Sequence, residues 1–197
     1  MILAIVLAAG ASSRMGQAKA ALPMGSTGQT VVGRVVQTLI EGGAPRVIVV
    51  AGAHIDAVRA AMPRESRARV IEHPGWAEGQ LSSLLAGLNA IDEPLLEAII
   101  VTLVDVPLVT AGTVAAVIAA WRAHRAPITR PVDGERHGHP VIFDRAVFED
   151  LREADPNVGA KAVFAKHRDR IMNVNVKDPG AFEDMDTPED YRKLRGE

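Results

Sequence analysis

Residues 2–19 read ILAIVLAAGASSRMGQAK, an apolar run followed by a loop of small and basic residues. The apolar part predicts a strand over Ile2–Leu7 that is buried on both faces, as strands in parallel sheets are. The glycines and other small residues of the loop let backbone N–H groups come close to an anion. Arg14 can make a bidentate contact to a phosphate and Lys19 a point contact, and no acidic residue occurs before Glu41. The stretch therefore predicts a buried strand that leads into a phosphate-binding loop.

Neither of the two best-known phosphate-binding motifs fits this loop. A P-loop has four residues between its glycines and a lysine directly after the second, whereas five residues separate Gly10 from Gly16 and Lys19 lies three further on. The dinucleotide-binding pattern GxGxxG is also absent. The loop is thus a phosphate loop of another kind or, alternatively, an exposed turn whose charges only keep it in solution.

The composition predicts an ordinary globular protein with one domain over residues 1–197. Hydrophobic residues make up 48%, charged residues 23% and aromatic residues only 4%, so we expect an aliphatic core. The net charge of −2 argues against a nucleic-acid or membrane-surface partner. The absence of cysteine excludes disulfides and thiolate metal ligands. No basic residue precedes the apolar run Ile2–Ala9, which is far shorter than the roughly 20 residues that cross a bilayer, so we expect a cytoplasmic protein with a small-molecule partner.

The first half of the chain alternates apolar runs with segments of helical periodicity. Such alternation is typical of an α/β fold whose mainly parallel sheet is covered on both faces. Such sheets bind ligands at the carboxyl ends of their strands, where the loop after Ile2–Leu7 and the later LVDVP both lie. The predicted strands are Ile2–Leu7, Arg46–Ala51, Arg69–Glu72 and Ala98–Val104, and the predicted helices begin near Thr30, at Ile55 and just after Gly79.

The second half predicts an antiparallel pair added to this sheet. Pro127–Val132 and His139–Phe143 flank the turn signal Asp133-Gly134, in a long hairpin-like connection. Thr110 is expected to cap the helix that precedes this pair. The remaining predicted elements are helices over Ala146–Glu153 and Val158–His167, a strand over Ile171–Val176 and a last helix from Thr187.

Three aspartates are candidates for holding a metal ion. Asp105 follows the strand predicted over Ala98–Val104, and Asp184 and Asp186 precede the last predicted helix. Mg²⁺ prefers such hard oxygen ligands and commonly joins one or two carboxylates to substrate phosphates. Each aspartate alone has a simpler interpretation, since a turn before Pro107 or a helix start also favours an acidic residue. Together with the basic glycine loop, the carboxylates predict a site for a Mg²⁺–nucleotide complex.

A polar turn at His137-Gly138-His139-Pro140 is a further candidate. Its two histidines suggest zinc, but no third ligand stands at a recognisable spacing, which disfavours a zinc site. We expect the turn to line the substrate pocket, with Gly138 allowing a ligand close to the backbone.

Six motifs resemble, in their order along the chain, those of molybdenum cofactor cytidylyltransferases and more broadly of MobA-like nucleotidyltransferases. They are LAAGASSRMGQAK (7–19), EGQLSSL (78–84), VDVP (104–107), GHPVIF (138–143), VGAKAV (158–163) and DMDTPEDY (184–191). The resemblance spans nearly the entire chain. It implies a single-domain, Rossmann-like three-layer α/β/α sandwich with a mostly parallel mixed sheet, the nucleotide-diphospho-sugar transferase fold. It also implies transfer of a nucleoside monophosphate from a triphosphate, with release of pyrophosphate.

The resemblance further assigns roles to individual residues. Arg14, Lys19 and Asp105 would be catalytic, with Arg14 and Lys19 holding the triphosphate. Asp105 and Asp186 would bind Mg²⁺, with Asp184 as the alternative to Asp186. The nucleotide would lie against Leu7, Ala8, Ala9, Gly10, Ser12, Ser13, Arg14, Lys19, Gly79, Gln80 and Ser83, and the acceptor against His137, Gly138, His139 and Pro140.

The donor and acceptor also follow from the resemblance. The sequence LAAG, where guanylyl-transferring relatives tend to have LAGG, favours CTP as the donor. The implied acceptor is a small phosphorylated molecule such as molybdopterin, with a molybdoenzyme or its maturation chaperone as a further partner. Two other functions stay open: a sugar-phosphate nucleotidylyltransferase, which shares the fold and the loop, and a non-catalytic chaperone that carries a nucleotide-like cofactor. A carrier would not need a metal-binding carboxylate, which favours an enzyme.

Overall fold

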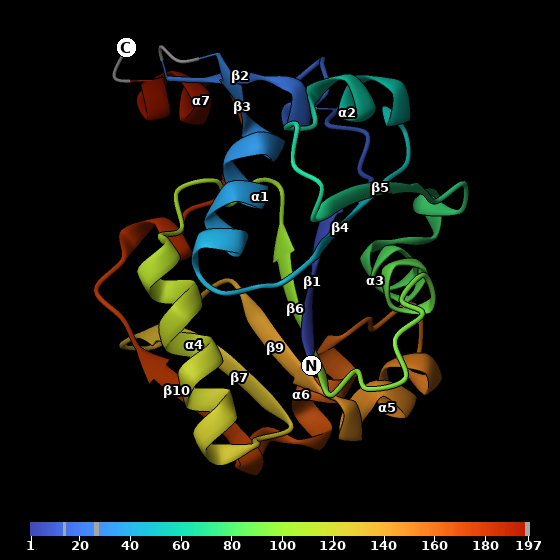
Figure 1. Ribbon diagram of the computed structural model, residues 1–197, viewed down its shortest axis with the longest axis vertical. Coiled ribbons are helices and arrows are strands. Elements are labelled where there is room, and N and C mark those ends of the chain that lie inside the picture. The colour runs from blue at the N-terminus through green and yellow to red at the C-terminus, as the bar shows by residue number, and fades with distance from the viewer. Residues whose placement is uncertain (14, 26–27, 196–197) are drawn as a thin grey trace.

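The apolar strands form one mixed, eight-stranded sheet through the middle of the molecule (Figure 1). The computed structural model describes residues 1–13, 15–25 and 28–195. Across the sheet, the strands are β10 (Ile171–Asn175), β7 (Ile128–Asp133), β9 (Val141–Asp144), β6 (Ala98–Leu103), β1 (Ile2–Ala8), β4 (Val47–Ala51) and β5 (Ala68–Glu72), and the short β8 (Arg136–His137) pairs with β7.

The pairing of the strands divides the sheet into a parallel and a mixed half. β1 lies between β4 and β6 and is parallel to both, and β4 is parallel to β5. β9 is antiparallel to both β6 and β7, and β10 runs parallel to β7. The antiparallel pair expected on either side of Asp133-Gly134 is therefore confirmed. It extends the parallel strands instead of forming a separate sheet.

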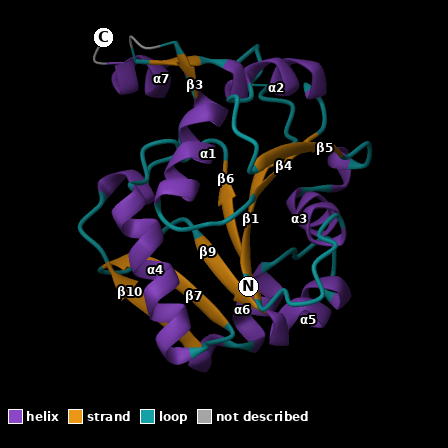
Figure 2. Ribbon diagram, viewed as in Figure 1, coloured by secondary structure: helices purple, strands orange, loops and turns teal. Residues whose placement is uncertain are grey.

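Helices cover both faces of the sheet, which confirms the expected three-layer α/β/α arrangement (Figure 2). Within the described ranges, no helix combines the length and the apolar character needed to cross a membrane. One face carries α1 (Val31–Glu41) and α4 (Ala111–His124), the other carries α3 (Gln80–Asn89), α5 (Phe148–Glu153) and α6 (Lys161–Lys166), and α2 (Ile55–Ala61) and α7 (Pro188–Arg195) lie toward the upper edge in Figure 1.

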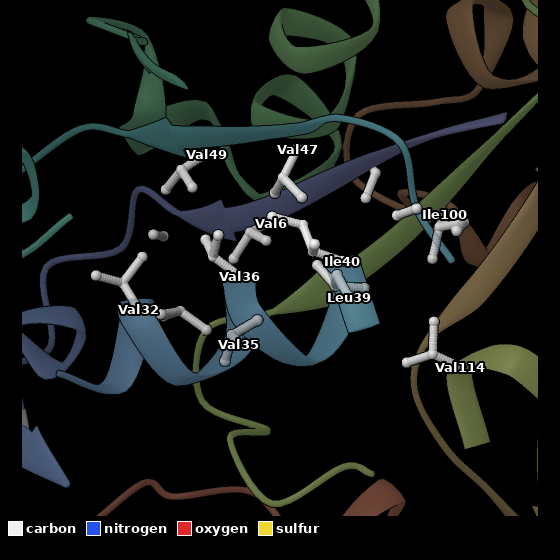
Figure 3. Close-up of a cluster of buried hydrophobic side chains, with 14 of the residues drawn as sticks. Val6, Val32, Val35, Val36, Leu39, Ile40, Val47, Val49, Ile100 and Val114 are labelled. Carbon is white, nitrogen blue, oxygen red and sulfur yellow. The ribbon is translucent and has the colours of Figure 1, made fainter. Parts of the chain in front are cut away.

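Strand β1 is apolar at every position because both of its faces are buried. Val6 belongs to the core cluster under α1 and α4, whereas Ile5 belongs to the cluster under α3, and neither is exposed. Burial of such a side chain contributes about 1.5–3 kcal/mol. Figure 3 shows the first cluster, where Val36 and Leu39 of α1 pack toward the sheet. Thr30 starts this helix, since its Oγ1 accepts a hydrogen bond from the Gly33 N–H at 3.0 Å.

Two local features differ from the sequence-based expectation. Helix α6 begins at Lys161 and not at Val158, because the N–H groups of Val158 and Gly159 donate to the Asp155 carbonyl in a separate turn. Gly159 has a φ of +69°, which ends that turn in the left-handed region. The short strands β2 (Pro23–Met24) and β3 (Gln29–Thr30) pair with each other and were not predicted. Two-residue strands leave no periodicity to read.

Candidate active site

Loops from three neighbouring strands meet at the carboxyl edge of the sheet, after β1, β4 and β6. The N–H of Val104 donates to the carbonyl of Leu7, and the N–H of Ala53 donates to that of Ala9, both at 3.1 Å. A cavity of about 350 Å³, the first cavity, lies at this edge beside the start of α3. Its lining includes many of the predicted site residues: Leu7, Ala8, Ala9, Gly10, Ser12, Lys19, Gly79, Gln80, Ser83 and Asp105.

The loop after β1 presents backbone N–H groups that have no acceptor among the described residues. The carbonyl of Ser12 accepts hydrogen bonds from the N–H groups of Met15 (2.9 Å) and Gly16 (3.2 Å), which closes a tight turn. Buried Met15 anchors this turn in the core. The N–H groups of residues 10–13 donate to no other described residue. A Cβ added at Gly10 would meet no atom within 4 Å. Unused N–H groups beside an open cavity form a cradle that suits an anion.

Two members of the predicted nucleotide-binding set are not placed in the first cavity. Arg14 lies outside the described residues, so its contact with a triphosphate stays a prediction. Ser13 is exposed and is not part of the cavity lining.

Lys19 lies between two of the predicted metal-binding carboxylates. Its Nζ is 2.6 Å from Oδ1 of Asp186 and 3.7 Å from Oδ2 of Asp105. The residue is only 9% exposed, and its N–H donates to Oγ of Ser12 at 3.3 Å, which ties the lysine to the loop. The glycine loop and the acidic motifs, which are far apart in the sequence, therefore meet at one point.

The segment before α7 reaches this point because Met185 anchors it. The Met185 N–H donates to the carbonyl of Asp105 at 2.7 Å, and its side chain is buried in the core. On the other side of Asp186, the carboxylate of Asp190 accepts hydrogen bonds from the N–H groups of Asp186 (3.1 Å) and Thr187 (2.8 Å). These contacts hold the backbone on both sides of the Asp186 carboxylate.

Asp105 carries a carboxylate oxygen that the described part of the chain leaves unsatisfied. Its Oδ1 is buried and has no hydrogen-bond partner among the described residues. Burial raises the pKa of Asp105, Lys19 opposes this effect, and the negative charges of Asp184 and Asp186 raise the pKa further. A buried carboxylate with a free oxygen is costly unless a cation or donor satisfies it. The position therefore suits a ligand that brings positive charge.

Of the three candidate carboxylates, that of Asp105 lines the first cavity. Asp184 lines a separate cavity with Glu183 and Lys193, whereas Asp186 contacts Lys19 at the edge of the first cavity. Among the described residues, no three His, Cys, Asp or Glu side chains are grouped so that they alone could hold a metal ion. A cation at Asp105 would therefore need further oxygens from a ligand or from water, as Mg²⁺ commonly has.

Among the residues of the first cavity that the sequence reasoning missed are a histidine and a tryptophan. His54 follows β4, and its Nε2 lies 2.8 Å from the carbonyl oxygen of Ala11. Trp76 lies in the turn before α3 and packs against Gly52, where a Cβ would come within 2.5 Å of the Trp76 side chain. The position of His54 just past a buried strand was a usable signal. Trp76 gave none.

A second cavity of about 360 Å³ adjoins the first. The two share Leu7, Gln80 and Leu103 in their linings. Of the turn predicted to contact the acceptor, His137, Gly138 and His139 line the second cavity, whereas Pro140 does not belong to its lining. The predicted donor and acceptor residues thus lie around adjoining spaces.

The fold itself also requires glycine at position 138. A Cβ at this position would come within 2.2 Å of the Ala181 carbonyl oxygen and 2.7 Å of the Phe182 ring. The missing side chain therefore makes room for the neighbouring backbone and for the Phe182 ring, and the predicted contact of Gly138 with an acceptor stays a prediction.

The fold and the site together define a class of protein. At this parallel sheet edge an amide-rich loop, Lys19 and Asp105 line one cavity, and Asp186 pairs with the lysine. Such an arrangement is characteristic of nucleotide-binding α/β proteins. The family model of the MobA-like NTP transferase domain matches residues 4–171. The chain belongs to this family of nucleotidyltransferases.

The relatives of this chain carry names that describe different activities. The chain is 30% identical to nicotine blue oxidoreductase of Paenarthrobacter nicotinovorans, over 98% of this chain and 96% of the relative. It is 26% identical to the molybdenum cofactor cytidylyltransferase of Escherichia coli (strain K12), over 95% and 92% of the two chains.

A solved structure, that of Rv0371c from Mycobacterium tuberculosis H37Rv, is 30% identical with a TM-score of 0.83, covering 100% of this chain and 98% of the other. A second structure of that protein is described as a complex with manganese, at 29% identity and a TM-score of 0.76 over 99% of this chain and 98% of the other.

Proposed function

We propose that this protein transfers a nucleoside monophosphate, CMP from CTP in the favoured case, to a phosphorylated acceptor and releases pyrophosphate. The observation that carries the proposal is the position of Lys19 Nζ, 2.6 Å from Asp186 and 3.7 Å from Asp105 at the wall of the first cavity. The open N–H groups of residues 10–13 supply the anion cradle beside it. Family membership supports the reaction class.

The reaction needs little acid–base chemistry from the protein. An oxygen of the acceptor phosphate attacks the α-phosphorus, the bond from that phosphorus to the bridging oxygen breaks, and pyrophosphate leaves with the electron pair. A phosphate monoester is already largely ionised near neutral pH, so no strong general base is required. The protein contributes position and charge: the loop after β1 orients the triphosphate, and Lys19 offsets its negative charge.

The residues present fit a divalent cation. The buried, unpartnered Oδ1 of Asp105 and the carboxylate of Asp186 are the hard oxygen donors that Mg²⁺ prefers. When bound, the cation would stabilise charge on the transferring group and on the leaving pyrophosphate. The ammonium of Lys19 lies between the two carboxylates. With a cation and a nucleotide bound, the ammonium would pair with the phosphates instead. The manganese complex described for the Mycobacterium tuberculosis protein supports a divalent cation in a close relative.

The proposed donor and acceptor rest on finer features. Ala9 lines the first cavity, and we propose that its methyl group, where guanylyl-transferring relatives tend to have glycine, selects against the larger base. Molybdopterin is the proposed acceptor because the cytidylyltransferase of Escherichia coli covers almost the entire chain. The relative named as an oxidoreductase is the reason to test a second chemistry in the same experiment.

The experiment is a pyrophosphate-release assay with ATP, CTP, GTP and UTP, each with and without molybdopterin. We expect release above background with CTP and molybdopterin together. Asp105→Asn should lower this rate by about 100-fold or more, since one charged contact in a water-poor site is commonly worth about 3 kcal/mol. Asp56→Asn, at an exposed aspartate of α2 outside both cavities, is the matched control and should leave the rate unchanged.

Two results would overturn the proposal. One is no release of pyrophosphate from any of the four nucleotides; oxidation of NADH or NADPH in the same samples would then favour the second chemistry. The other is a rate in Asp105→Asn equal to that of the wild type.

A further inference from the structure

Arg130 interrupts an apolar row on the sheet face beneath the second cavity. In the pairing of β6 with β9, Val101 lies opposite Val141. β7 pairs with the other side of β9, where Ile128 lies opposite Phe143. Continued by two residues, this antiparallel register places Arg130 of β7 beside Val141. The apolar members of this row belong to the core cluster under α3 and α6. Because side chains alternate along a strand, Arg130 faces the same side as Ile128. An arginine therefore stands where the pattern calls for an apolar residue, and it lines the second cavity.

The guanidinium of Arg130 is held in place but not neutralised. Its Nε donates to Oδ1 of Asn173 at 3.0 Å, and its Cζ lies 5.5 Å from the centroid of the Phe164 ring. No carboxylate of the described residues forms an ion pair with it, and its two terminal nitrogens have no hydrogen-bond partner in the same part of the chain. Arg130 is half-buried, and burial lowers its pKa. An orientated, uncompensated arginine is costly to keep unless it binds an anion.

All other ionisable side chains of this lining are basic as well. They are Lys161, His137 and His139, and the described lining contains no aspartate or glutamate. The Nδ1 atom of His139 is buried and has no partner among the described residues. The remaining walls are largely apolar, with Leu84 and Phe143 among them. Burial lowers the pKa of His137 and of His139. The cavity therefore combines an apolar body with the cationic side chains of Arg130 and Lys161, and the described lining supplies no carboxylate to either.

The position of Arg130 relative to the first cavity decides which group it can bind. A phosphate that attacks the α-phosphorus must lie at the border formed by Leu7, Gln80 and Leu103. Leu103 belongs to β6, and Arg130 lies two strands away on β7. Two strand spacings amount to about 10 Å, and the hydrogen bond from Nε to Asn173 of β10 holds the guanidinium on the side of β7 that is away from β6. One phosphate cannot occupy both places.

We propose that the second cavity holds the acceptor by an anionic group other than the reacting phosphate, and that Arg130 and Lys161 bind this second group. The acceptor class is then a molecule with two anionic ends joined by an apolar or ring-like body. That this molecule is an acceptor rests on the transferase function proposed above. The anion site itself rests on the residues of the second cavity.

The test uses two fluorescent probes that differ in one group. 8-Anilinonaphthalene-1-sulfonate has an apolar ring body with a sulfonate, and N-phenyl-1-naphthylamine is the same body without it. Both are titrated into the full-length protein without nucleotide. The wild type should bind the sulfonate about tenfold more tightly or better, the range for one charge-assisted hydrogen bond. Arg130→Gln should remove this preference and leave the neutral probe unaffected.

Further variants make the result specific. Lys161→Gln, at an exposed position, should weaken the sulfonate severalfold, and Arg130→Lys should restore part of the loss in Arg130→Gln. Arg122→Gln is the matched control, because Arg122 is exposed on α4 at the opposite face of the sheet. It should bind both probes like the wild type. Circular dichroism checks the fold of each variant. If Arg130→Gln does not fold, Lys161→Gln alone still tests the site.

Equal affinity of the wild type for the two probes would overturn the inference, and so would unchanged sulfonate binding in both Arg130→Gln and Lys161→Gln. These results are distinct from a failure of the proposed function. Absence of pyrophosphate release with the probe pattern intact would contradict the transferase reaction and keep the anion site. The reverse combination would contradict only the anion site.

Discussion

Gly10 is the position at which the proposed anion cradle can be tested with the least damage to the fold. It lines the first cavity, a Cβ there would meet no atom within 4 Å, and its φ is outside the left-handed region. Gly10→Ala should therefore change the free energy of unfolding by no more than about 0.5 kcal/mol. The added methyl group would hold a phosphate away from the backbone N–H groups. Loss of one charge-assisted hydrogen bond costs about 1.5–3 kcal/mol, which corresponds to an increase of about 10- to 150-fold in the Kd for CTP.

The assay is the quenching of tryptophan fluorescence by CTP with Mg²⁺, because Trp76 lines the same cavity. Gly138→Ala is the contrasting variant: its Cβ would come within 2.2 Å of the Ala181 carbonyl oxygen. This overpacking should cost about 1–3 kcal/mol of stability while leaving CTP affinity unchanged at a temperature where the protein is folded. The reasoning would be refuted if Gly10→Ala bound CTP as tightly as the wild type.

Two further predictions concern donor preference and stability. Ala9→Gly should raise the kcat/KM for GTP relative to CTP by about tenfold, the usual value of one methyl group in a pocket; an unchanged ratio in steady-state kinetics would show that this methyl group does not select the base. Asp178→Asn should lower the Tm by about 4–8 °C at pH 7, equivalent to about 2 kcal/mol, because the Asp178 carboxylate accepts hydrogen bonds from Thr110 and from Thr113. Burial raises the pKa of Asp178, but these hydrogen bonds outweigh it and hold the pKa below its ordinary value. This stabilisation is therefore complete above about pH 4 and is lost as the pH falls through the lower folded-state pKa. Thermal melts that differ from the wild type by the same amount at pH 7 and at pH 2 would contradict the assignment, with exposed Asp169→Asn as the control.

Much of the fold could be predicted because burial leaves a direct mark on the sequence. Strand β1 is apolar at every position since both of its faces are covered, and the helical spacing of valines after Thr30 identified α1 together with its cap. The start of α6 was not predictable from periodicity. The choice between helix and turn at Val158 depends on which carbonyl accepts its N–H, and that carbonyl belongs to Asp155.

Some residues of the site could likewise be predicted from the sequence, and others could not. Gly10, Lys19 and Asp105 could be found because small, basic and acidic residues follow buried strands, and strand ends are where such sheets bind ligands. The meeting of Lys19 with Asp186 could not be derived from spacing, since the two are 167 positions apart and Met185 brings them together. Arg130 carried a signal that was overlooked, a charged residue at an inward position of a strand.

The affinity for CTP with and without Mg²⁺, measured by calorimetry in the wild type and in Asp105→Asn, tests the proposed metal–triphosphate site most directly. Mg²⁺ should tighten CTP binding to the wild type by about tenfold or more, because the cation joins the carboxylate to the phosphates. In Asp105→Asn we expect tighter binding of metal-free CTP than in the wild type, since a negative charge facing the phosphates is gone, and little gain from Mg²⁺. An equal gain from Mg²⁺ in both proteins would contradict a role for Asp105 in holding the metal.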